Sequence, residues 1–137
     1  MIVYVDTSVI LRLLLGQKTP LDPSGWESAY SSEILGLEAR RVIDRLRLES
    51  TLDDRGVMEA HRELGRIEQS IGVVALTRGV LWRAALPMPT VVKTLDAIHL
   101  TSALVLRARL NVSLVFATHD SQQATAAYAL GFKVLGA

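Results

Sequence analysis

Four short, largely apolar runs divide the chain. Runs of four or five such residues are typical of strands buried in a sheet. The predicted strands are residues 2–5, 72–76, 114–117 and 132–135.

Between these runs, apolar residues recur at intervals of three and four, the spacing of amphipathic helices. Several of these segments follow residues that cap helices well, such as Thr7 with Ser8, Ser31 or Ser32, and Thr77. The predicted helices are residues 9–15, 33–49, 53–71, 78–85, 95–106 and 122–130, and residues 17–25, which contain two prolines, form a predicted loop.

Strands separated by helices predict an α/β fold in which the strands run parallel and helices cover both faces of the sheet. A chain of 137 residues, half of them hydrophobic, is long enough for a substantial core. We therefore expect a single domain over residues 1–137.

The composition narrows the classes of function. A net charge of only +1 argues against a protein that grips nucleic acid along a broad basic surface, although it allows a local groove. The absence of cysteine excludes disulfides, thiolate zinc sites and cysteine nucleophiles. Without a leader-like segment or an apolar run of about 18 residues, the chain is expected to be cytoplasmic and to lack a membrane span.

Four acidic residues stand beside these hydrophobic elements. Asp6 and Asp120 follow predicted strands and precede helices, so each is either a helix cap or an acid at the rim of the sheet. Asp96 falls in the first turn of a helix, where the helix dipole favours a negative charge. Glu38 lies in mid-helix beside the apolar face and needs a partner, for which Arg41 has the favourable spacing.

Acids that converge on one rim of a sheet repel one another, and hard divalent cations relieve that repulsion because carboxylate oxygens are their preferred ligands. Capping explains any one of the four acids but not all four at compatible positions in one small chain. The pattern points to metal-assisted phosphoryl chemistry.

Four segments of the chain match a known family. They are Val5-Asp-Thr-Ser-Val-Ile10, residues 32–41 with Glu38, Leu95-Asp-Ala-Ile-His-Leu-Thr-Ser-Ala103, and Ala117-Thr-His-Asp120 followed by residues 126–127 and 131–135. In these segments the chain resembles the PIN-domain ribonucleases, and most of all the toxins of VapBC toxin–antitoxin pairs. The resemblance implies a three-layer α/β/α PIN-like fold with a central parallel sheet of four to five strands.

The resemblance also implies a mechanism. Asp6, Glu38, Asp96 and Asp120 match the family's acidic quartet and would bind one or two Mg²⁺ or Mn²⁺ ions, with Asp6 and Asp96 as direct ligands and the other two binding directly or through water. A metal-activated water would then hydrolyse an RNA phosphodiester.

Neighbouring polar residues have two readings each. Thr7, Ser8 and Thr118 match small polar positions of the family, but they could equally cap helices. His119 could contact RNA or remain a solvated loop residue. For His99, one turn after Asp96, we predict a half-buried side chain satisfied by the backbone, with a hydrogen bond to the acid cluster as the alternative.

Other classes fit less well. A haloacid-dehalogenase-type phosphatase needs an acid two residues after Asp6, where Ser8 stands, and a receiver domain needs paired acids near the first strand. The remaining alternatives are a PIN nuclease outside a toxin–antitoxin pair and a non-catalytic PIN scaffold that binds a protein.

The resemblance implies partners as well. They are an RNA substrate, a cognate antitoxin that places a basic side chain at the acidic site, and a second copy of the chain in a homodimer. We expect residues 33–49 and 53–71 to form the dimer or antitoxin surface.

Overall fold

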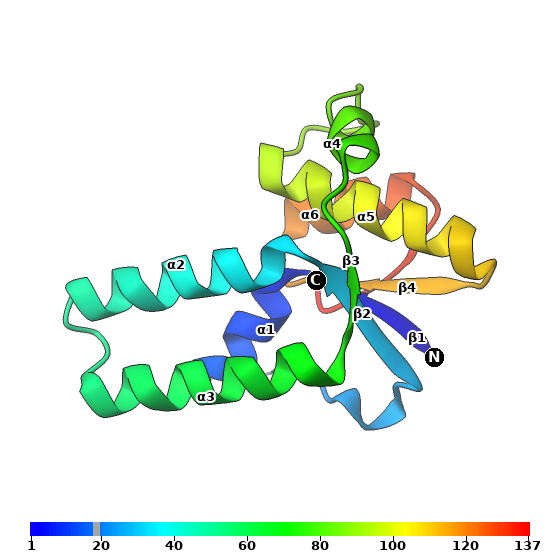
Figure 1. Cartoon of the computed structure of the whole chain (residues 1–137). Helices are drawn as coiled ribbons and strands as arrows, with labels where there is room; N and C mark the ends of the chain where they lie inside the picture. Colours follow the sequence, from blue (N-terminus) through cyan, green and yellow to red (C-terminus); the bar gives the residue numbers. More distant parts are fainter. Residues whose placement is uncertain (18–19) are drawn as a thin grey trace.

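The computed structural model describes residues 1–17 and 20–137, so residues 18–19 of the predicted 17–25 loop lie outside it. Five parallel strands form one sheet in the order β3-β2-β1-β4-β5 (Figure 1). The strands are β1 (Ile2–Val5), β2 (Ser28–Ser32), β3 (Gly72–Val74), β4 (Leu114–Ala117) and β5 (Lys133–Leu135).

The helices follow the predicted order, with ends that differ by a few residues. A short 3-10 turn, η1 (Pro23–Gly25), lies in the predicted loop and is capped by the Asp22 side chain. The helices are α1 (Thr7–Leu14), α2 (Ile34–Leu48), α3 (Asp54–Ser70), α4 (Arg78–Ala84), α5 (Thr94–Leu110) and α6 (Ser121–Ala129).

Helices cover both faces of the sheet, which gives the expected three-layer α/β/α architecture. Alternate side chains of a strand point to opposite faces, so Val3 and Val5 pack against α1, α2 and α3. Tyr4, between them, packs with Phe116 against α5 and α6 on the other face. The two central strands are therefore buried on both sides, as their continuous apolar runs predict.

Strand β2 was not predicted. Its residues 28–32 read Ser-Ala-Tyr-Ser-Ser, and we had placed helix-capping serines there. The segment is a strand because it pairs with β1 on one side and with β3 on the other. Ser31 donates a hydrogen bond to the carbonyl oxygen of Val5 at 2.7 Å, while the Ser32 hydroxyl accepts from the backbone N–H of Ile34 at the start of α2.

The strand order fixes where a ligand can bind. From β1 the chain adds β2 and then β3 on one side, and it returns to add β4 and β5 on the other. In open α/β sheets, ligands bind beyond the carboxyl ends of the strands where the order reverses. Here that point lies between β1 and β4, directly before Asp6 and Thr118.

None of the helices in the described residues is long and apolar enough to cross a membrane.

Candidate active site

The four acids line one pocket of about 470 Å³ at the reversal point of the strand order. They reach it from four separate parts of the chain. Asp6 follows β1, Glu38 lies on α2, Asp96 lies on α5, and Asp120 precedes α6.

Asp6 is held by hydroxyl groups and does not cap a helix. It occupies the N-cap position of α1, but its side chain makes no capping hydrogen bond, so the capping alternative is wrong for this residue. Its Oδ2 atom accepts hydrogen bonds from the Ser8 hydroxyl at 3.0 Å and from the Thr118 hydroxyl at 2.6 Å. The residue is only 5% exposed, and such burial of a charge requires partners of this kind.

Glu38 is bound through one oxygen. Its Oε1 atom accepts from the Thr7 hydroxyl and lies against Nε2 of His99, each at 2.7 Å. Burial acts to raise the pKa of Glu38, but the hydrogen bonds from His99 and Thr7 outweigh burial and hold the pKa below its usual value.

Arg41, the partner that we expected for Glu38, pairs with another residue. Arg41 pairs with Asp44 at 3.1 Å, within α2. The neighbouring Arg40 pairs with Glu68 of α3 at 2.7 Å. Arg41 nonetheless lines the acidic pocket.

Asp96 lies half-buried in the first turn of α5. Burial raises the pKa of this carboxyl, and the negative charges of Asp6 and Asp120 raise it further. Burial is the larger cause, and the repulsion between acids that the sequence pattern led us to expect adds to it.

Asp120 has both of its predicted roles. Its Oδ1 atom accepts from the backbone N–H groups of Gln122 and Gln123, at 2.9 and 3.1 Å, and so caps α6. The same side chain lines the acidic pocket. The helix cap fixes the position of this carboxylate.

Three small polar residues donate hydrogen bonds to the acids: Thr7 to Glu38, and Ser8 and Thr118 to Asp6. Thr7 and Ser8 lie in the first turn of α1, and Thr118 holds Asp6 while its hydroxyl accepts from the backbone N–H of Asp120 at 3.0 Å. The backbone N–H of His119 donates to the Ser8 hydroxyl at 2.9 Å, and its Nδ1 atom lies 2.9 Å from the carbonyl oxygen of Gly136. His119 lines a neighbouring hollow of about 640 Å³, which it shares with Asp120 and with Arg12.

Sequence reasoning misjudged His99. The side chain is fully buried, and its partners are side chains and not the backbone. Nδ1 lies 2.7 Å from the Tyr4 hydroxyl, and Nε2 contacts Thr7 at 3.0 Å as well as Glu38. Its position one turn after Asp96 was the available signal, and it suggested only that a bond to the acid cluster was possible.

The donor set suits a hard cation. Within residues 1–17 and 20–137, no three Asp, Glu, His or Cys side chains come close enough to form a ready-made metal site. The hydrogen bonds described above use only one oxygen each of Asp6, Glu38 and Asp120, and none engages the Asp96 carboxylate. Carboxylate oxygens that face a shared pocket are the ligands that Mg²⁺ and Mn²⁺ prefer.

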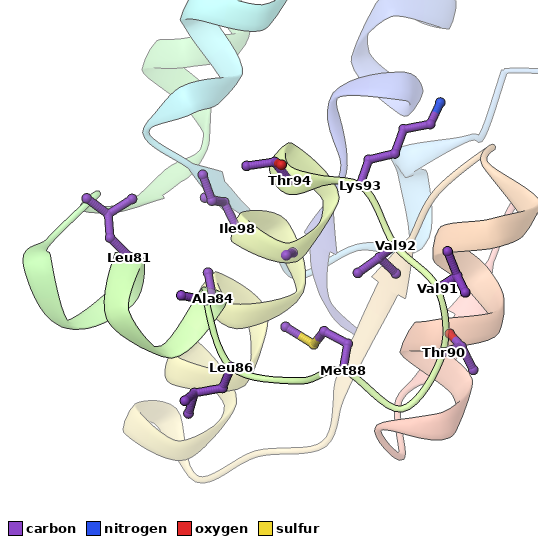
Figure 2. Close-up of a pocket in the computed structure, with 12 residues that line it drawn as sticks. Leu81, Ala84, Leu86, Met88, Thr90, Val91, Val92, Lys93, Thr94 and Ile98 are labelled. Atoms are coloured by element: carbon purple, nitrogen blue, oxygen red, sulfur yellow. The ribbon is translucent and has the colours of Figure 1, made fainter.

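A second hollow, of about 460 Å³, lies between α4 and the first turns of α5 and contains none of the four acids (Figure 2). The loop that joins the two helices contributes Leu86 and Met88, and Ile98 contributes from α5. Leu81, on α4, lines the hollow and is 46% exposed. This hollow is apolar, so it suits a protein surface better than a phosphate.

The family follows from comparison with known sequences. The model of the PIN domain matches residues 3–128, and the chain belongs to this family. PIN domains are generally nucleases, so the fold is that of a nuclease. No curated protein matches the chain.

Proposed function

We propose that the protein is an endoribonuclease that depends on Mg²⁺ or Mn²⁺ and uses Asp6, Glu38, Asp96 and Asp120. One observation carries this proposal: four acids from four distant segments line a single pocket at the point where the strand order reverses.

Each of the four acids has a proposed role at the cation. Asp6 and Asp96 would hold the cation directly, with Glu38 and Asp120 binding directly or through water. A divalent cation bound there would activate a water molecule and offset the charge that develops on the phosphodiester. The protein orients these carboxylates. Hydroxyl groups hold Asp6, and Glu38 is held by Thr7 and His99. The helix cap holds Asp120.

Basic side chains beside the acids support RNA as the substrate. Arg41 lines the acidic pocket. Arg12 and Arg45 line the adjoining hollow, and Ser8 and Asp120 line both the hollow and the acidic pocket. Arginines along a local groove can bind phosphates of the backbone even when the net charge of the protein is near zero. The near-neutral balance of the chain is consistent with such a groove.

Metal removal tests the proposal. The purified protein, freed of any bound partner, should cleave cellular RNA with Mg²⁺ or Mn²⁺ and lose that activity with EDTA, because the carboxylates alone cannot supply the positive charge. Cleavage is measured by gel electrophoresis of RNA incubated for fixed times. Adding the metal back after EDTA should restore cleavage. Activity that persists in EDTA would contradict the metal requirement, and no cleavage or metal binding under any condition would favour a binding scaffold.

We further propose that the protein is the cytoplasmic toxin of a VapBC-type pair. A basic antitoxin side chain would enter the acidic pocket and compete with the cation. Exposed Leu37 and Leu95 line that pocket and offer apolar contacts to the same partner. A small protein that co-purifies with the chain and suppresses cleavage is the expected observation, and a nuclease that needs no such partner would lie outside this class.

We propose a second candidate surface for the homodimer, in addition to residues 33–49 and 53–71. Helices α2 and α3 lie side by side (Figure 1), and Ile43 and Leu64 are fully buried in the core, so part of their apolar faces is covered within the protein. The hollow between α4 and α5 remains exposed and apolar, and patches of this kind mark contacts with other proteins.

Substitution in this hollow tests the dimer. Leu81→Glu should convert a dimer to a monomer, because it places a charge in a desolvated interface. Molecular mass measured by light scattering reports the change. Leu48→Glu is the matched control, because Leu48 is 68% exposed and is the last residue of α2, a helix whose far end lies away from α4 (Figure 1). Equal masses for both variants and the native chain would contradict the proposed interface.

A further inference from the structure

His99 connects three elements of the fold through its two ring nitrogens. It comes from α5, while its partners lie on β1, on α1 and on α2. Nδ1 lies 2.7 Å from the Tyr4 hydroxyl, and Nε2 lies 2.7 Å from Oε1 of Glu38. Nε2 also lies 3.8 Å from Oδ1 of Asp6. The ring is fully buried, so water does not compete for these contacts.

The partners determine which nitrogen carries the proton. A carboxylate only accepts hydrogen bonds, so Nε2 must donate to Glu38. A neutral ring that donates from Nε2 accepts at Nδ1, and the Tyr4 hydroxyl can donate to it. The contact with Glu38 therefore places a proton on Nε2, and the Tyr4 hydroxyl can pair with the other nitrogen.

The result is a fixed orientation for Glu38. Thr7 and His99 both bind Oε1, so Oε2 carries no hydrogen bond among the residues that the structure describes. Asp6 is arranged in the same way, because Ser8 and Thr118 both bind Oδ2. Among the described residues, each of these two acids is hydrogen-bonded through one oxygen only.

We propose that His99 is a positioning residue that, fixed in turn by Tyr4, turns the Oε2 atom of Glu38 toward a cation in the acidic pocket. This inference rests on the proposed function, because it assigns His99 a part in the same metal site. It goes further in that a residue outside the pocket lining would set the affinity of the site.

Three variants separate positioning from core packing. His99→Gln keeps an N–H donor near the place of Nε2, whereas His99→Leu fills the space without a donor. Tyr4→Phe removes only the hydroxyl that holds the ring. Groups that orient metal ligands typically contribute about 10- to 100-fold to metal affinity.

In the experiment, each purified protein is titrated with Mn²⁺ in the absence of RNA, and the binding is measured by isothermal titration calorimetry. We expect His99→Leu to bind Mn²⁺ about 10- to 100-fold more weakly, His99→Gln to recover most of the affinity, and Tyr4→Phe to fall between them. Nitrogen-15 NMR of the imidazole in the native protein should show a proton on Nε2. Thermal unfolding tests whether each variant is folded. If His99→Leu does not fold, the Mn²⁺ affinity of Tyr4→Phe is compared with that of the native protein instead.

The outcomes are distinct. Native protein that binds no Mn²⁺ overturns the proposed function and this inference with it. Native protein that binds Mn²⁺ no more tightly than folded His99→Leu, or no more tightly than Tyr4→Phe if the leucine variant does not fold, overturns the positioning role alone. A ring protonated at Nδ1 and not at Nε2 does the same, because Nε2 could not then donate to Glu38.

Discussion

Asp96→Asn should cut RNA about 10³-fold more slowly than the native protein and yet be more stable when no metal is present. The loss of activity follows if Asp96 holds the cation, because a neutral amide is a poor ligand for Mg²⁺. The gain in stability follows because burial of this carboxyl, and then the repulsion from the other three acids, make its charged form unfavourable. A variant that gains stability cannot have lost activity by unfolding.

The pH dependence has a definite sign. The pKa of Asp96 is raised in the folded protein, so folding is penalised by its charge once the pH rises through that raised pKa. The advantage of Asp96→Asn should therefore be present at neutral pH and vanish below the pKa of an unfolded aspartate, about 4. Because the group is only half-buried, we expect the advantage to stay below about 1 kcal/mol.

The measurement is urea unfolding with EDTA, at neutral and at acid pH, beside a cleavage assay with Mg²⁺. Asp54→Asn is a matched control, because Asp54 lies in the first turn of α3 as Asp96 lies in the first turn of α5. Both substitutions remove a favourable contact with a helix dipole, but Asp54 is outside the pocket. The control should cut RNA normally, and native cleavage rates in Asp96→Asn would refute the assignment.

Phe116→Ala should cost about 3 to 5 kcal/mol of the free energy of unfolding. Phe116 is fully buried at the centre of β4. Its ring stacks on Tyr4 at 5.3 Å between centroids and contacts Phe132 at 5.7 Å. Removing it opens a cavity in the face of the sheet that supports Tyr4 and, through Tyr4, His99.

Chemical unfolding measures the loss, and the melting temperature should fall by about 10 °C or more. Tyr128→Ala is the control, because Tyr128 on α6 is 73% exposed and such surface substitutions usually change stability by less than about 0.5 kcal/mol. A loss below about 1 kcal/mol for Phe116→Ala would mean that the aromatic cluster contributes little.

The sequence predicted most of the fold because its strands are mostly apolar runs and its helices mostly periodic. The exception, β2, shows the limit of that reasoning. Residues 28–32 are mainly serine and alanine, and only their place between β1 and β3 makes them a strand. Such pairing depends on residues far away in the chain, which a local pattern does not contain.

The site shows the same division. The four acids were identified because each stands at a recognisable place, and the structure brings them to one pocket. The side chains that hold the acids in place were not identified, because they lie far away in the sequence. His99 and Glu38 are 61 residues apart, and His99 and Tyr4 are 95 residues apart. The spacing along α2 suggested Arg41 for Glu38, but the helix places that arginine beside Asp44.

The strand order has a consequence for synthesis of the chain on a ribosome. Asp6 and Glu38 are synthesised before Asp96 and Asp120, and β4 enters beside β1 at the centre of the sheet. A nascent chain that has not yet reached residue 120 has half of its acids in place and an open edge where β4 belongs. Under the function proposed above, a nascent chain at that stage should lack the nuclease activity that needs all four acids.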